Sequence, residues 1–122
     1  MAAFNWIVFV DTCPHCGKTA SIKAQCHVAS TFDGDARGRF CNNTYQLNED
    51  MIWWEKDDTR WSQWTVGGQL VSERAGSIDQ CCYASCDKCQ ADIFAVVAFE
   101  PIKAVYVKQV GLEKDWPANY EK

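Results

Sequence analysis

The chain has 122 residues, a formal net charge of -4 and a sequence pI of about 5.0. Its length suits one ordinary domain, and 48% hydrophobic residues with six tryptophans exclude a disordered chain. The negative charge argues against a protein that mainly grips nucleic-acid phosphates, because that affinity comes from clustered Lys and Arg. No apolar run approaches the roughly 20 residues that cross a bilayer, so we expect no membrane segment.

The first half of the chain has the pattern of β-strands. Residues 4–10 are rich in Phe, Trp, Ile and Val, and they run directly into a cysteine motif, which favours a buried strand over a signal peptide. Residues 18–25 alternate polar and apolar side chains and predict a returning strand. Residues 31–39 contain Gly and Asp and predict a loop or tight turn. The β-prone runs 51–55 and 60–66 predict a hairpin.

The second half continues in the same way. Residues 80–85 and the apolar run 91–99 predict strands on either side of a second cysteine motif, and residues 103–108 predict one more. Residues 115–122 are expected to form an extended tail. Since no long stretch shows a 3.6-residue period, the sequence predicts a mainly β protein.

Eight cysteines in a chain without an export signal indicate metal or redox chemistry in a reducing compartment, so we expect a cytoplasmic protein. Four of them form two Cys-x-x-Cys pairs. A tight turn with this spacing aims both sulfurs at one point and leaves turn amides free to face the thiolates. Structural zinc takes four ligands in a tetrahedron. The pairs therefore predict one structural Zn2+ held by Cys13, Cys16, Cys86 and Cys89.

The residue after each pair differs between the two motifs. Gly17 follows the first pair and can take the positive φ that such a turn needs after its second ligand. Gln90 occupies the same place after the second pair. The second turn is therefore predicted to be less regular or to carry strain.

Two Cys-x-x-Cys pairs between β-prone runs resemble the zinc-ribbon family, in which two β-hairpins clamp one tetrahedral ion. The resemblance implies a single domain over residues 1–122. Its ribbon halves are residues 4–25 and 80–110. A long Trp-rich β insertion occupies residues 26–79, and residues 113–122 form a tail.

A narrower likeness joins CPHCG, the second Cys-x-x-Cys pair and Trp116-Pro117 followed by Asn-Tyr-Glu. Together they resemble a bacterial zinc ribbon that precedes a helical domain of unknown function in restriction- and defence-associated proteins. In that family the segment after Trp-Pro leads into the helical domain, whereas this sequence stops at Lys122. The likeness implies a free-standing or truncated ribbon with a phage- or defence-related role.

Cys13-Pro14-His15-Cys16 also resembles the active-site motif of thiol–disulfide oxidoreductases with a thioredoxin fold. In those enzymes the first thiol lies at a helix N-terminus, which lowers its pKa. Here the run after Cys16 alternates like a strand, and the second pair would have no role. Oxidoreductase activity is the alternative to zinc binding.

The remaining cysteines allow a second metal site, although their irregular spacing favours buried thiols. Its candidate ligands are Cys26, His27, Cys41, Cys81 and Cys82.

The tryptophans of the insertion are the candidate binding residues: Trp53, Trp54, Trp61 and Trp64. Their alternation favours packing in a sheet core. An exposed half would form a patch for a protein partner, and base stacking in a nucleic-acid-binding ribbon is the alternative. No Ser/His/Asp order or phosphate loop is present. We therefore expect a non-enzymatic, zinc-binding interaction module with a protein partner.

Overall fold

The computed structural model describes residues 3–28, 30, 32–53, 57, 72–74, 77–100 and 102–120. Within these residues, the regular elements are strands apart from one short 3-10 helix, η2 (Glu113–Asp115), which confirms the mainly β prediction. The strands are β1 (Asn5–Thr12), β2 (Thr19–Cys26), β3 (Gly34–Asp35), β4 (Gly38–Arg39), β5 (Thr44–Gln46), β6 (Ser72–Arg74), β7 (Ser77–Cys86), β8 (Asp92–Glu100) and β9 (Lys103–Leu112). No helix in these ranges is long and apolar enough to cross a membrane.

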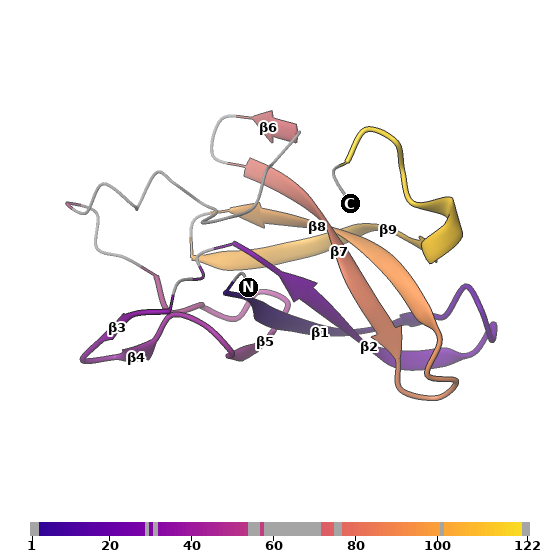
Figure 1. Ribbon diagram of the computed structural model, residues 1–122, viewed down its shortest axis with the longest axis horizontal. Coiled ribbons are helices and arrows are strands. Elements are labelled where there is room, and N and C mark those ends of the chain that lie inside the picture. Colours follow the sequence, from indigo (N-terminus) through magenta and orange to yellow (C-terminus); the bar gives the residue numbers. More distant parts are fainter. Residues whose placement is uncertain are drawn as a thin grey trace.

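Most of these strands belong to one curled sheet with the order β5-β1-β2-β7-β8-β9, and β6 pairs with β7 (Figure 1). The hairpin β1–β2 is antiparallel, as are the pairs β2–β7, β7–β8 and β8–β9, whereas β5 runs parallel to β1. Within the predicted turn, β3 and β4 form a small separate hairpin. The predicted strands around both cysteine pairs are thus confirmed.

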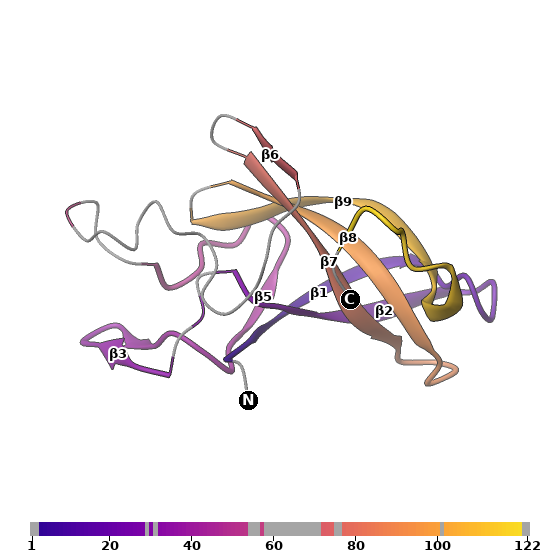
Figure 2. The ribbon, with the colours of Figure 1, turned by 45° about the horizontal axis from the view of Figure 1, so that its top comes forward.

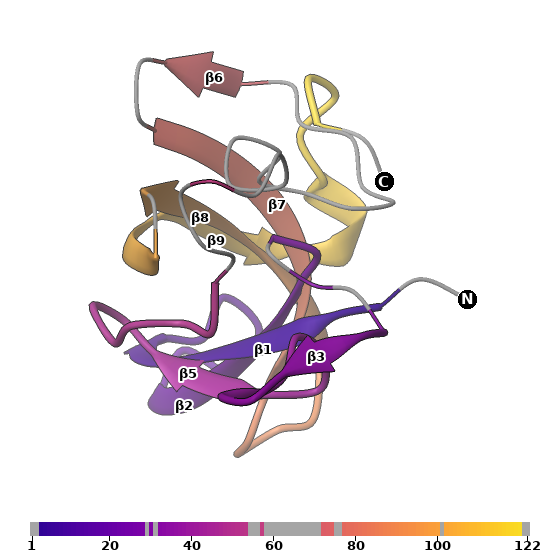
Figure 3. The same ribbon diagram turned by 90° about the vertical axis from the view of Figure 1, so that its left-hand side faces the viewer.

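The core lies inside the curl of the sheet. Alternate residues of β2, among them Ile22 and Ala24, are fully buried, as their period-two pattern predicted. Figure 3 shows β1, β2 and β5 below and β7, β8 and β9 above. Side chains of both groups pack into one apolar cluster.

The segment after β5 joins the two edges of the sheet. The Asn48 amide donates to the Ala104 carbonyl at 2.7 Å, and the Met51 amide donates to the Ile102 carbonyl at 2.6 Å. These bonds tie the end of β5 to the start of β9, so the sheet curls toward a barrel (Figure 2). Met51 and its neighbour Trp53 are buried in the core.

The predicted hairpin over residues 51–66 is only partly covered by the structure. Residues 51–53 are described and do not form a strand. Among the others, only residue 57 is described, so the remainder of this prediction lies outside the described residues.

The segment expected to be an extended tail instead folds back on the sheet. Its Trp116 ring lies 4.8 Å from the Tyr83 ring and 5.9 Å from the Phe94 ring, measured between centroids. The Trp116 indole Nε1–H donates to the Tyr120 carbonyl at 3.2 Å. The prediction was wrong because β8 is apolar on both faces, and its outer face needs a cover.

Candidate metal centre

The two cysteine pairs meet at one end of the sheet. Cys13 and Cys16 lie in the turn between β1 and β2, and Cys86 and Cys89 lie at the turn between β7 and β8 (Figure 1). The ladder between β2 and β7 pairs Ile22 with Cys86, which places the two turns side by side. Backbone pairing therefore assembles the cluster.

The four sulfur atoms lie close enough together to hold one metal ion. The Sγ atoms of Cys13 and Cys89 lie 3.7 Å apart, and those of Cys16 and Cys86 lie 4.0 Å apart. All four lie within 4.8 Å of one another. Zinc–sulfur bonds of about 2.3 Å in a tetrahedron place sulfurs about 3.8 Å apart. The predicted ligands are thus brought together in a geometry compatible with zinc.

The two turns hold their first cysteine in the same way. The His15 amide donates to the Cys13 Sγ at 3.4 Å, and the Lys88 amide donates to the Cys86 Sγ at 3.4 Å. Amides that face sulfur stabilise a thiolate, which is the form that binds a metal. The expected orientation of the turn amides is confirmed.

Both turns also close with a residue in the left-handed region. Gly17 has φ +72° and Gln90 has φ +61°. The Gly17 amide donates to the Cys13 carbonyl at 2.8 Å, and the Gln90 amide donates to the Cys86 carbonyl at 3.0 Å. A side chain in this conformation costs about 1–2 kcal/mol. The second turn is therefore as regular as the first, and Gln90 bears the strain.

A further residue, Asp87, fastens the second turn to the first hairpin. Its amide donates to the Ser21 carbonyl at 3.1 Å, and its Oδ1 accepts the Ser21 amide at 3.0 Å. Sequence reasoning missed this role, because an aspartate within a Cys-x-x-Cys turn does not reveal a partner 66 residues away. The bonds orient Cys86 and Cys89 toward the other pair.

The thiols of the cluster differ in acidity. Burial raises the pKa of Cys13, but hydrogen bonds from turn amides and from the Cys86 and Cys89 thiols outweigh it and lower the pKa from 9.0 to about 7. The Ala91 amide lowers the pKa of Cys89, but desolvation and the neighbouring thiols raise it from 9.0 to about 11. The Cys13 thiolate is thus stabilised by hydrogen bonds from the Cys86 and Cys89 thiols as well as from the turn amides.

The structure does not bring together the residues considered for a second metal site. Among the described residues, one group of three or more potential ligands is close enough to hold an ion, and it is the four-cysteine cluster. Cys26 and Cys82 are buried in the main core, and burial raises the pKa of Cys26 to about 12. Cys81 packs on the opposite face of the sheet. His27 Nδ1 lies 2.9 Å from the Ala3 carbonyl. The placement of Cys26, Cys81 and Cys82 agrees with the interpretation that they are buried thiols.

Of the four candidate binding tryptophans, Trp53 is the one that the structure describes. Trp53 has 2% of its surface exposed and belongs to the core cluster, so it presents no surface to a partner. Core packing was the interpretation that its pattern favoured. Trp54, Trp61 and Trp64 lie outside the described residues.

The Cys13-Pro14-His15-Cys16 motif lies in a turn between antiparallel strands, and β2 follows it where a thioredoxin-like site would have a helix. Comparisons of the chain with family models, with curated proteins and with solved structures found no match. The likeness to zinc ribbons therefore rests on the four-cysteine cluster and its two hairpin turns.

Proposed function

We propose that the protein is a non-enzymatic, zinc-binding interaction module that recognises another protein. One Zn2+ held by Cys13, Cys16, Cys86 and Cys89 would join its two hairpins. The observation that carries the proposal is the arrangement of the four Sγ atoms, all within 4.8 Å of one another.

The chemistry of the cluster supports a structural role. A tetrahedral set of four sulfurs suits zinc or iron, and zinc is the ion that such sites hold without redox chemistry. Four protein ligands leave no position for a reactive water. Cys13 and Cys86 are 0% and 1% exposed, so the ion would be shielded on the side of the sheet.

The net charge supports a protein partner. A net charge of -4 disfavours association with a phosphate backbone. Steeply salt-dependent binding to single- or double-stranded oligonucleotides would contradict this part of the proposal. Reduction of insulin disulfides by the chain would contradict its non-enzymatic character.

Metal analysis of the purified chain tests the zinc site. We expect one zinc per chain, no visible absorption from an iron tetrathiolate, and a large fall in the midpoint of thermal unfolding on chelation, because structural zinc contributes on the order of 10 kcal/mol of folding free energy. Cys13→Ser and Cys86→Ser should lose the zinc. Cys41→Ser, a half-buried cysteine outside the cluster, is the matched control and should keep it. A metal-free chain with an unchanged unfolding midpoint would refute the site.

A further inference from the structure

The strand β5 covers only part of the edge of β1. It pairs with Trp6–Val8, whereas β1 continues to Thr12. After β5 the chain turns away at Asn48, which has φ +65° and bonds to the start of β9. Among the described residues, none pairs with β1 on this side beyond Val8.

The open part of the edge presents backbone groups of Val10. The Trp6 amide donates to the Asn43 carbonyl at 2.8 Å, so Trp6 and the residues two and four positions later direct their backbone groups to the β5 side. Val10 therefore offers an amide and a carbonyl to an incoming strand. The Thr12 amide donates to the Asp11 Oδ1 at 2.7 Å, which ends the free stretch. Such an edge is a template for strand addition.

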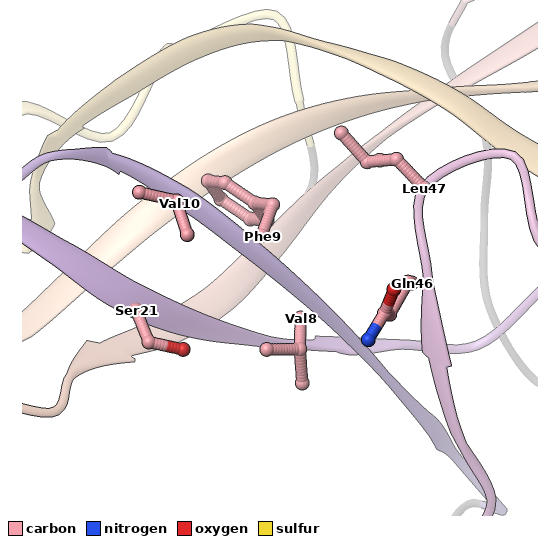
Figure 4. Close-up of a pocket in the computed structure, with 6 residues that line it drawn as sticks. All are labelled: Val8, Phe9, Val10, Ser21, Gln46 and Leu47. Atoms are coloured by element: carbon pink, nitrogen blue, oxygen red, sulfur yellow. The ribbon is translucent and has the colours of Figure 1, made fainter.

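A hollow of about 430 Å³ lies along this edge (Figure 4). It is lined by Val8, Phe9, Val10, Ser21, Gln46 and Leu47. Ser21 belongs to β2 and Gln46 to β5, so the hollow extends across β1 at the place where β5 ends. Val10 is 71% exposed although it is apolar. Val10 thus offers an exposed apolar contact for an apolar side chain of an incoming strand.

Exposed acidic residues neighbour the residues that line the hollow. Asp11 is exposed directly after Val10. On the β5 side, Glu49 accepts the Gln46 amide through Oε1 at 2.8 Å, and Asp50 follows it on the surface. Lys23, on the neighbouring strand, lies over the Trp6 ring with Nζ 4.5 Å from its centroid. Lys23 pairs with Val8 and is the one cation among these described neighbours, so the three carboxylates outnumber it and, with the net charge of -4, favour a cationic segment.

We propose that an extended, cationic segment of a partner protein binds here as an added strand, taking the place along β1 that β5 leaves. Its backbone bonds to Val10, an apolar side chain enters the hollow, and its basic residues face Asp11 and Glu49. The proposal names the partner chemistry of the interaction module and rests on that function.

The test uses the zinc-loaded chain and a short fluorescein-labelled peptide of alternating lysine and valine, followed by fluorescence polarisation. Val10→Pro removes the edge amide at a position where edge strands tolerate proline, and it should weaken binding about tenfold or more. Val10→Thr keeps the amide and the β propensity, and it should bind within about threefold of the parent. Zinc content and the unfolding midpoint are measured for each variant.

If Val10→Pro does not fold, the parent chain still decides the question. N-methylation of the peptide on the alternate residues that face β1 should abolish binding, and methylation in the other register should preserve it. Equal binding of both methylated peptides would overturn strand addition, as would unchanged binding by folded, zinc-loaded Val10→Pro.

A second set of variants tests whether the acidic residues contribute to binding. Asp11→Asn and Glu49→Gln keep the acceptor oxygens that bond Thr12 and Gln46, so they remove charge alone. Each should weaken binding by up to about fivefold and flatten its salt dependence. Equal binding of a glutamate–valine peptide, or no binding of the lysine peptide to a zinc-loaded chain, would overturn the proposal. A folded chain without zinc that still binds the peptide would instead refute the structural zinc and leave the strand site standing.

Discussion

Replacing Gly111 by alanine tests how tightly the outer face of the sheet is packed. Gly111 of β9 pairs with Phe94 of β8. A Cβ at position 111 would lie 2.5 Å from the Phe94 Cε2 and 2.6 Å from its Cζ. Restoring ordinary van der Waals contact requires a shift of roughly 1 Å. The Phe94 ring is fully buried, with Trp116 packed against it, so it has little room to move.

The expected cost follows from this overlap. Overpacking of a well-packed core costs about 1–3 kcal/mol, so we expect Gly111→Ala to lower the free energy of unfolding by about 2 kcal/mol. For a chain of this size that corresponds to a midpoint about 6–10 °C lower. Thermal unfolding followed by circular dichroism, at a fixed excess of zinc, measures the shift.

A double-mutant cycle separates this clash from general damage. Trp116→Ala alone should cost about 2 kcal/mol, roughly half the loss for a fully buried tryptophan, because Trp116 is only partly buried. In the double variant the Phe94 ring gains space, so the combined cost should be smaller than the sum by at least about 0.5 kcal/mol. An unchanged midpoint for Gly111→Ala, or strictly additive costs, would refute the packing described for this face.

Three shorter predictions concern the turns, pH and a buried charge. Gln90→Gly should raise the unfolding midpoint slightly, since relief of about 1–2 kcal/mol of strain exceeds the entropic cost of glycine, and Gly17→Gln should lower it. The metal-free fold should gain stability from about pH 7 to pH 8 in urea titrations, because the Cys13 pKa of about 7, lowered from 9.0, makes the unfolded chain bind more protons there. Near and above pH 9 it should lose stability, because Cys26 and Cys89, with pKa raised to about 12 and about 11, keep their protons in the fold while the unfolded chain releases them. A flat profile would contradict this assignment. Lys108→Met should lower the free energy of unfolding measured by urea titration. It removes the cation 2.7 Å from the Asp79 carboxylate, which is 2% exposed.

The four-cysteine cluster was predictable because its geometry is mostly local. A spacing of three residues lets each turn aim two sulfurs, and tetrahedral coordination demands that the pairs meet. The strands beside each pair were predictable for the same reason, since alternation along β2 reports which side chains face the core. Even the strain at Gln90 was indicated, by comparison with Gly17 at the equivalent place.

What the sequence did not reveal depends on distant contacts. The bonds from Asp87 to Ser21 and from Asn48 to Ala104 join segments whose pairing no local pattern reports. Trp116 folds back because β8 presents apolar side chains on both faces. A continuous apolar run in the sequence indicates that both faces of a strand are buried, but it does not indicate which segment covers each face. Trp53 lies in the core, as its pattern favoured, but in a segment that is not a strand, which the aromatic pattern did not indicate.

The distance along the chain between the two cysteine turns bears on how the protein folds in time. Cys16 and Cys86 are 70 residues apart, whereas the cysteines within each turn can meet as soon as that turn forms. Closing such a long loop is a slow, entropically costly event, and long-range strand pairing is slow for the same reason. A zinc ion first captured by one turn would hold the other on encounter. On the proposed function, the free zinc concentration would therefore govern how fast the chain reaches its fold as well as how stable that fold is.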